Sequence, residues 1–90
     1  MSDRSPSGFT AYGNRAGDSG VLAYAVGTGW IDVVFDDRAA IYRYGHGKPG
    51  RGHVTRMIAL ARQGRGLATY INQRVRTNYQ SRRPLNWPAD

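Results

Sequence analysis

Three closely spaced and mostly apolar stretches occur in the first half of the chain. The stretches are GVLAYAV (20–26), WIDVVF (30–35) and AAIYRY (39–44). Each is rich in β-branched and aromatic residues, and short breaks containing Gly or Asp separate them, as is typical of strands joined by tight turns. The pattern therefore predicts an antiparallel meander of three strands.

The position of the turns predicts the register of these strands. A two-residue turn at positions 37–38 sets Val33 opposite Tyr42, which makes one face of the sheet apolar and aromatic. The same register sets Asp32 opposite Arg43 on the other face, where opposite charges pair favourably. A slip of one residue would invert both faces. By the same reasoning, a turn at 28–29 directs three side chains inward: Leu22, Tyr24 and Val26.

After Pro49 the apolar residues recur at helical spacing. One side of a first helix carries Val54, Met57, Ile58 and Ala61, and one side of a second carries Leu67, Ala68, Ile71, Val75 and Tyr79. We predict an α+β domain of order β-β-β-α-α, in which a three-stranded antiparallel meander has two helices packed on one face. The predicted core comprises Leu22, Ile31, Val33, Phe35, Tyr42, Ile58, Ile71 and Val75.

Ninety residues are enough for one small domain with one modest core. We assign 1–18 to a flexible N-terminal arm, in which FTAY is compatible with a short edge strand, 19–80 to the folded domain and 81–90 to a C-terminal tail. We expect a monomer. No stretch is apolar enough to span a membrane, and the absence of cysteine fits a reducing compartment, so we expect a cytoplasmic protein.

Charge adds an expectation about partners. Thirteen basic residues, twelve of them Arg, stand against six Asp and no Glu, which gives a net charge of +7. The planar guanidinium binds phosphate and carboxylate groups and stacks on rings. A strongly basic composition suggests nucleic acid, an acidic protein surface or an anionic membrane as partner. Of these we expect nucleic acid or an acidic protein surface, and neither a membrane nor a small-molecule substrate. An Arg-rich composition that serves only solubility is the alternative.

The loop GHGKPGRG (45–52) has the composition of a phosphate-binding loop but lacks its pattern. A P-loop requires GxxxxGK[ST], whereas Lys48 is followed by Pro49, which has neither an N–H group nor a hydroxyl. We therefore expect an irregular hinge between strand and helix. Lys48 and Arg51 are suited to a loose contact with a backbone phosphate near the start of the helix.

Neither catalysis nor cofactor binding is indicated by the sequence. His46 and His53 have no neighbouring Glu or Cys to complete a metal site, and no cofactor is expected. No paired carboxylates and no nucleophile–His–acid set are evident, so we predict that the protein is not an enzyme.

Seven residues are the candidates for contact with a partner. Trp30 and Arg43 belong to the sheet face opposite the helices, which we expect to be open and which also carries Asp32, Val34 and Ile41. Tyr42 and Tyr44 resemble rings that stack bases, but the register turns them toward the helices as core. The candidates are Trp30, Arg43, Lys48, Arg51, Arg56, Arg74 and Arg76.

Several short stretches together resemble a known family. IDVVF, IYRY, Pro49, Val54 with Ile58, and YINQRVRTNY are similar in order and spacing to the KTSC domain, a small domain also found at the C-terminus of some lysyl-tRNA synthetases. The resemblance covers about residues 20–80, and the residues GHGK and GRGH around Pro49 depart from it. Because the family also occurs as small stand-alone proteins of bacteria and phages, the resemblance implies a binding module.

We therefore predict a small, non-enzymatic basic module that contacts nucleic acid, RNA or single strands, through interactions between arginines and phosphates. One alternative is a protein–protein interaction factor, such as a phage-encoded inhibitor of a host system of the anti-CRISPR kind. Its anchors would be Trp30, Trp87 and the arginines, which are residue types enriched in binding hot spots. Another is a small structural subunit of a larger assembly.

Overall fold

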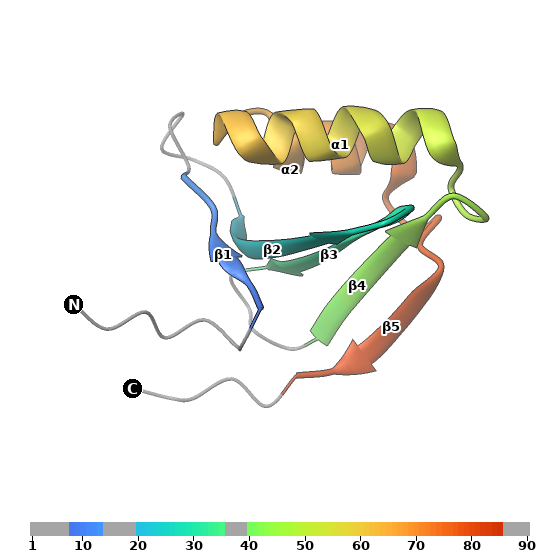
Figure 1. The fold of residues 1–90 in the computed structure, drawn as a ribbon, viewed down its shortest axis with the longest axis horizontal. Helices are drawn as coiled ribbons and strands as arrows, with labels where there is room; N and C mark the ends of the chain where they lie inside the picture. The colour runs from blue at the N-terminus through green and yellow to red at the C-terminus, as the bar shows by residue number, and fades with distance from the viewer. Residues whose placement is uncertain (1–7, 14–19, 36–39, 86–90) are drawn as a thin grey trace.

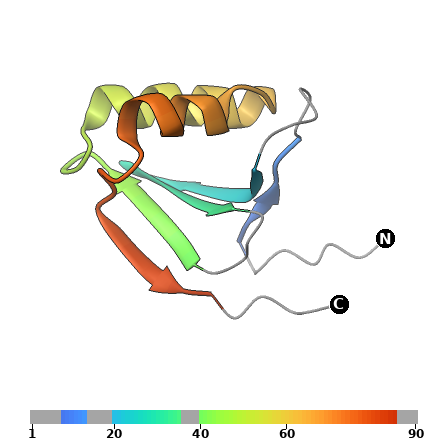
Figure 2. The same ribbon diagram turned by 180° about the vertical axis from the view of Figure 1, so that it is seen from behind.

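The computed structural model describes residues 8–13, 20–35 and 40–85. Five strands form one sheet: β1 (Thr10–Ala11), β2 (Val21–Gly27), β3 (Trp30–Phe35), β4 (Ala40–Gly45) and β5 (Ser81–Pro84). The helices are α1 (Arg51–Gln63), α2 (Leu67–Tyr70) and the π-helix η1 (Ile71–Val75). Because η1 continues directly from α2, we call the two together the second helix. The helices form one layer over one face of the sheet, as Figures 1 and 2 show.

The sheet has five antiparallel strands in the order β1-β2-β3-β4-β5, so the prediction of a three-stranded meander is wrong. The α+β class and the placement of both helices on one face are confirmed. Strand β1 pairs Thr10 with Tyr24, and β5 pairs Arg82 with Tyr42. The added strands lie within the segments 1–18 and 81–90, which are only partly described.

Strand β5 escapes sequence analysis because its residues carry no strand pattern. The segment Ser-Arg-Arg-Pro is polar and exposed along its whole length. Its pairing with β4 stabilises it, together with a hydrogen bond from Arg83 to Asp32. Both partners lie about 40 or more residues away in sequence, where local propensity has no influence.

The predicted register of the central strands is confirmed. Val33 lies opposite Tyr42 and Asp32 opposite Arg43, although the turn at 37–38 lies outside the described residues. The turn between β2 and β3 falls at 28–29 as expected. The inward placement of Leu22 is wrong, because the register shifts between Val21 and Ala23 and brings Val21 into the core instead.

The core lies between the sheet and the helix layer. It contains Tyr12, Val21, Ile31, Val33, Tyr44, Val54, Met57, Ala61, Leu67, Ile71 and Val75. The other predicted members, Phe35, Tyr42 and Ile58, are half-buried and pack against it. Tyr12 was not predicted; its hydroxyl accepts a hydrogen bond of 3.1 Å from the backbone N–H of Leu67, so it satisfies a free donor at the start of α2.

The connection between β4 and α1 is shorter and tighter than expected. Helix α1 begins at Arg51, so the last two residues of GHGKPGRG are helical. The backbone of 45–50 folds on itself, with Gly45 and Lys48 exchanging hydrogen bonds of 2.8 and 3.0 Å and Gly50 donating to the Gly45 carbonyl. At its other end α1 stops at Gly64, whose φ of 75° is readily accessible only to glycine.

The sheet face away from the helices is not open at the positions expected. Val34 is fully buried, and Asp32 and Ile41 are only 2% and 7% exposed. One reason is the position of the Arg83 side chain. Arg83 pairs with Ile41 on β4 and donates a hydrogen bond to Asp32 on β3, so its side chain crosses β4. The aliphatic stem of an arginine can cover apolar surface in this way.

Candidate nucleic-acid interface

A groove lies along the outer surface of the helix layer, with a volume of about 590 Å³. We call it the helix groove. Its walls come from both helices, and it is lined by Arg56 from α1 and Arg74 from η1. The side chains that line it are His53, Arg56 and Leu60 from α1 and Thr69, Tyr70, Gln73 and Arg74 from the second helix.

One hydrogen bond joins the two walls of the helix groove. His53 Nδ1 and the Tyr70 hydroxyl lie 2.8 Å apart, and their rings meet edge to face. The side chains of Arg56, Gln73 and Arg74 are exposed and make no hydrogen bond or ion pair within the described ranges. The groove therefore presents two guanidinium groups and an amide whose donors face water.

The charge around this groove is positive because the second half of the chain lacks acidic residues. No Asp or Glu occurs between Arg38 and Ala89. Within 46–80 the cations are Lys48, Arg51, Arg56, Arg62, Arg65, Arg74 and Arg76. Asp32 is the one carboxylate in the described part of the chain, and it is buried on the other side of the sheet. No described carboxylate therefore offsets the positive potential of the helix layer.

Asp32 is the centre of a paired cluster on that opposite face. Arg43 donates to both carboxylate oxygens, at 2.7 and 2.9 Å, and Arg83 donates to one of them at 3.0 Å. The hydrogen bond to Asp32 raises the pKa of Arg43 above its ordinary value. The guanidinium of Arg43 also stacks 4.0 Å from the centre of the Trp30 ring.

The indole ring of Trp30 packs against a glycine on the neighbouring strand. Gly27 lies opposite Trp30 in the register, and a side chain at that position would collide with the indole ring. The ring therefore lies against the Gly27 backbone, and Arg43 stacks on Trp30. Both candidates on this face are engaged in the sheet's own packing.

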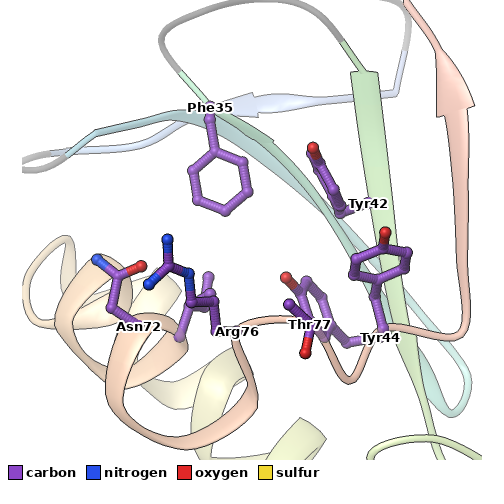
Figure 3. A pocket seen from close by; sticks show the side chains of 8 residues that line it. Phe35, Tyr42, Tyr44, Asn72, Arg76 and Thr77 are labelled. Atoms are coloured by element: carbon purple, nitrogen blue, oxygen red, sulfur yellow. The ribbon is translucent and has the colours of Figure 1, made fainter.

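A second cavity, of about 320 Å³, lies between the other flank of the second helix and strands β3 and β4. We call it the aromatic pocket. Figure 3 shows Asn72 and Arg76 rising from the helix on one side, Tyr42 and Tyr44 from β4 on the other, and Phe35 pointing into the space between them. Tyr79, from the segment after η1, completes the lining.

The rings of the aromatic pocket contact one another edge to face. Tyr42 meets Phe35 at 5.3 Å and Tyr79 at 5.1 Å between ring centres, and Tyr79 meets Tyr44 at 6.3 Å. Arg82 on β5 donates a hydrogen bond of 3.1 Å to the Tyr42 hydroxyl. Tyr44 is fully buried, and this burial raises its pKa well above the ordinary value.

The structure divides the seven candidates among four places. Arg56 and Arg74 share the helix groove, and Arg76 lines the aromatic pocket. Lys48 and Arg51 are exposed at the start of α1 and line neither cavity. Trp30 and Arg43 lie on the opposite sheet face, away from the rest.

Sequence analysis missed the neutral members of both cavities. Gln73 and the predicted candidate Arg74 follow Tyr70 by three and four residues. In a helix this spacing places side chains on one surface, so it was an available signal for Tyr70 and Gln73. Tyr42 and Phe35 were predicted as core, which the packing confirms in part, but sequence offers no signal that a cavity remains beside them.

Comparisons with protein-family models, with curated proteins and with solved structures find no match for this chain. None of the helices in the described part of the chain has the length and apolarity needed to cross a membrane. Within the same residues, no three His, Cys, Asp or Glu side chains gather closely enough to hold a metal ion.

Proposed function

We propose that the protein is a small, non-enzymatic cytoplasmic module that binds single-stranded nucleic acid through the helix groove. The observation that carries this proposal is the convergence of Arg56 and Arg74, which come from different helices and line one groove in a stretch without carboxylates. Guanidinium groups bind phosphate oxygens with charge-assisted hydrogen bonds.

The neutral side chains of the groove suit the same ligand. Gln73 offers an amide for sugar or base edges, and the half-buried Tyr70 ring offers a surface on which an unstacked base can lie.

The resemblance to KTSC domains supports a binding module. The stretches that carry the resemblance, IYRY and YINQRVRTNY, supply most of the residues that line the aromatic pocket.

Because the contacts are mainly to phosphates, affinity should be modest and strongly dependent on salt. Non-specific binding of this kind has a Kd of about 10⁻⁴ to 10⁻⁶ M at physiological salt. The test is a titration of fluorescein-labelled oligouridine, followed by fluorescence anisotropy over a range of salt concentrations. We expect the logarithm of the affinity to fall linearly with the logarithm of the salt concentration.

Two double variants of equal charge separate the groove from general electrostatics. Arg56→Gln with Arg74→Gln should lower the salt slope by about 1.4 units, because two phosphate contacts are lost and each contributes about 0.7 on a single strand. Arg62→Gln with Arg65→Gln removes the same charge from exposed positions that do not line the groove, and should change the slope much less. Equal effects of the two variants, or no binding at low salt, would refute the proposal. In the latter case, tight binding to an acidic protein would favour the interaction-factor alternative.

A further inference from the structure

We propose that the aromatic pocket holds one unstacked base of the bound strand, with Asn72 at the edge of the base and Arg76 on its phosphate. This inference rests on the proposed function and assigns a role to a cavity that phosphate binding does not need. It also makes the contact between the protein and the strand partly dependent on the base.

The shape and lining of the pocket fit a flat ring. Its volume of about 320 Å³ falls in the range of small-ligand sites. Phe35, Tyr42 and Tyr79 are half-buried, so part of each ring remains accessible from the cavity side. Aromatic rings pack best against other rings in stacked or edge-to-face geometries, and every base has a π-face that fits such a site.

The polar groups at the pocket point to a nucleotide rather than to an apolar ligand. The Asn72 amide is both a donor and an acceptor, which matches the mixed edge of a base. Arg76 lies four residues further along the helix and reaches into the same space (Figure 3). Within the described residues Arg76 has no hydrogen bond or ion pair, so its guanidinium is available to a phosphate.

The position of the pocket relative to the helix groove allows one strand to use both. Gln73 and Arg74 lie on the groove flank of the second helix, and Asn72 and Arg76 lie on the pocket flank. A strand that crosses this helix would therefore meet phosphate contacts on one side and the pocket on the other. The segment is a π-helix, a rare form that is often found at functional sites.

The test compares oligouridine with an abasic oligomer of the same length and the same number of phosphates. We expect the wild-type protein to bind oligouridine roughly 5- to 150-fold more tightly, because stacking of one base on aromatic side chains has that effect. Phe35→Leu removes a ring while keeping an apolar side chain, and Asn72→Ala alters an exposed position. Each should lower the ratio of the two affinities and leave abasic binding unchanged, with Phe35→Leu having the larger effect because it removes a stacking ring. An unchanged ratio in Phe35→Leu would overturn the base pocket. Far-UV circular dichroism checks that the variants are folded.

The groove variant with Arg56→Gln and Arg74→Gln is the matched control. It should weaken both oligomers by the same factor and so preserve the ratio. If wild-type protein binds both oligomers equally, the base pocket is refuted while the proposed function stands. If neither oligomer binds, both proposals fail together.

Two further arms locate the base and identify its source. With 4-thiouridine in the oligomer, photo-crosslinks should include Phe35, Tyr42 or Tyr79, and crosslinks confined to Tyr70 or Trp30 would overturn the assignment. Uridine monophosphate alone should bind much more weakly than the oligomer, because it lacks the groove contacts. Equal affinity would show instead that the pocket is a site for free nucleotide.

Discussion

The carboxylate of Asp32 offers the sharpest test of how the two faces of the sheet are held. It is 2% exposed and accepts three hydrogen bonds, two from Arg43 and one from Arg83. In Asp32→Asn the charge is lost, and one of the acceptor atoms becomes an NH₂ group that faces an arginine donor. Both guanidinium groups then lose their only described counter-charge.

The expected loss follows from burial. Removing one partner of a fully buried ion pair costs about 3–5 kcal/mol. The Arg43 and Arg83 side chains are 29% and 46% exposed, so water replaces part of what they lose. We therefore expect Asp32→Asn to lower the free energy of unfolding by about 2–3 kcal/mol. With a urea m-value of about 1 kcal/mol/M for a small domain, the midpoint shifts down by about 2–3 M.

The measurement is urea unfolding followed by far-UV circular dichroism, on a double-mutant cycle. Arg43→Gln alone should destabilise, since it breaks two charged hydrogen bonds and the stack on Trp30. In the Asp32→Asn background the same change should cost little, which gives a coupling energy of about 1–3 kcal/mol. The matching cycle with Arg83→Gln should show weaker coupling, because Arg83 makes one bond and is more exposed. Coupling below about 0.5 kcal/mol for Arg43 would refute the view that this pair stabilises the sheet.

Two further predictions concern the core. Val33→Asp should cost several kcal/mol, since it places an unpaired charge at a fully buried position, and a urea midpoint close to that of the wild type would contradict the register. Tyr44→Phe should flatten the fall in stability at high pH. The raised pKa of folded Tyr44 means that its contribution is complete below the ordinary value of 10.0 and is lost as pH rises further, because only the unfolded chain ionises. Unfolding titrations from neutral pH upward, with Tyr79→Phe as the control, would show the same slope in both variants if burial of Tyr44 were unimportant.

Sequence analysis predicted the middle of the fold and missed its edges for physical reasons. In β3 and β4 every second residue is apolar, so a register error would invert a face, and the pairing of Asp32 with Arg43 could be predicted. The irregularity at Leu22 could not, because a one-residue shift in register depends on how the strand meets its neighbours. Strand β5 is polar and exposed, and its stability comes from long-range pairing.

Sequence analysis predicted the charged residues of the candidate site but not which of them share a cavity. Net charge and helical spacing were enough to identify Arg56, Arg74 and Arg76 as exposed cations. Whether two of them share a groove depends on how α1 packs against the second helix, which local sequence does not determine. The same holds for the aromatic pocket, because apolar spacing predicts that Tyr42 faces the helices but says nothing of the space beside it.

The pairing of β5 with β4 has a consequence for the order in which the protein folds. Strands β2, β3 and β4 follow one another closely along the chain and pair with their sequence neighbours, whereas Arg82 meets Tyr42 across 40 residues that include both helices. Closing so long a loop is slow compared with forming a hairpin. During synthesis, therefore, β4 spends an interval with its outer edge unpaired, and that edge belongs to the β-prone segment AIYRYG. Pairing with β5 covers this edge in the folded protein, so we expect it to limit edge-to-edge association of chains.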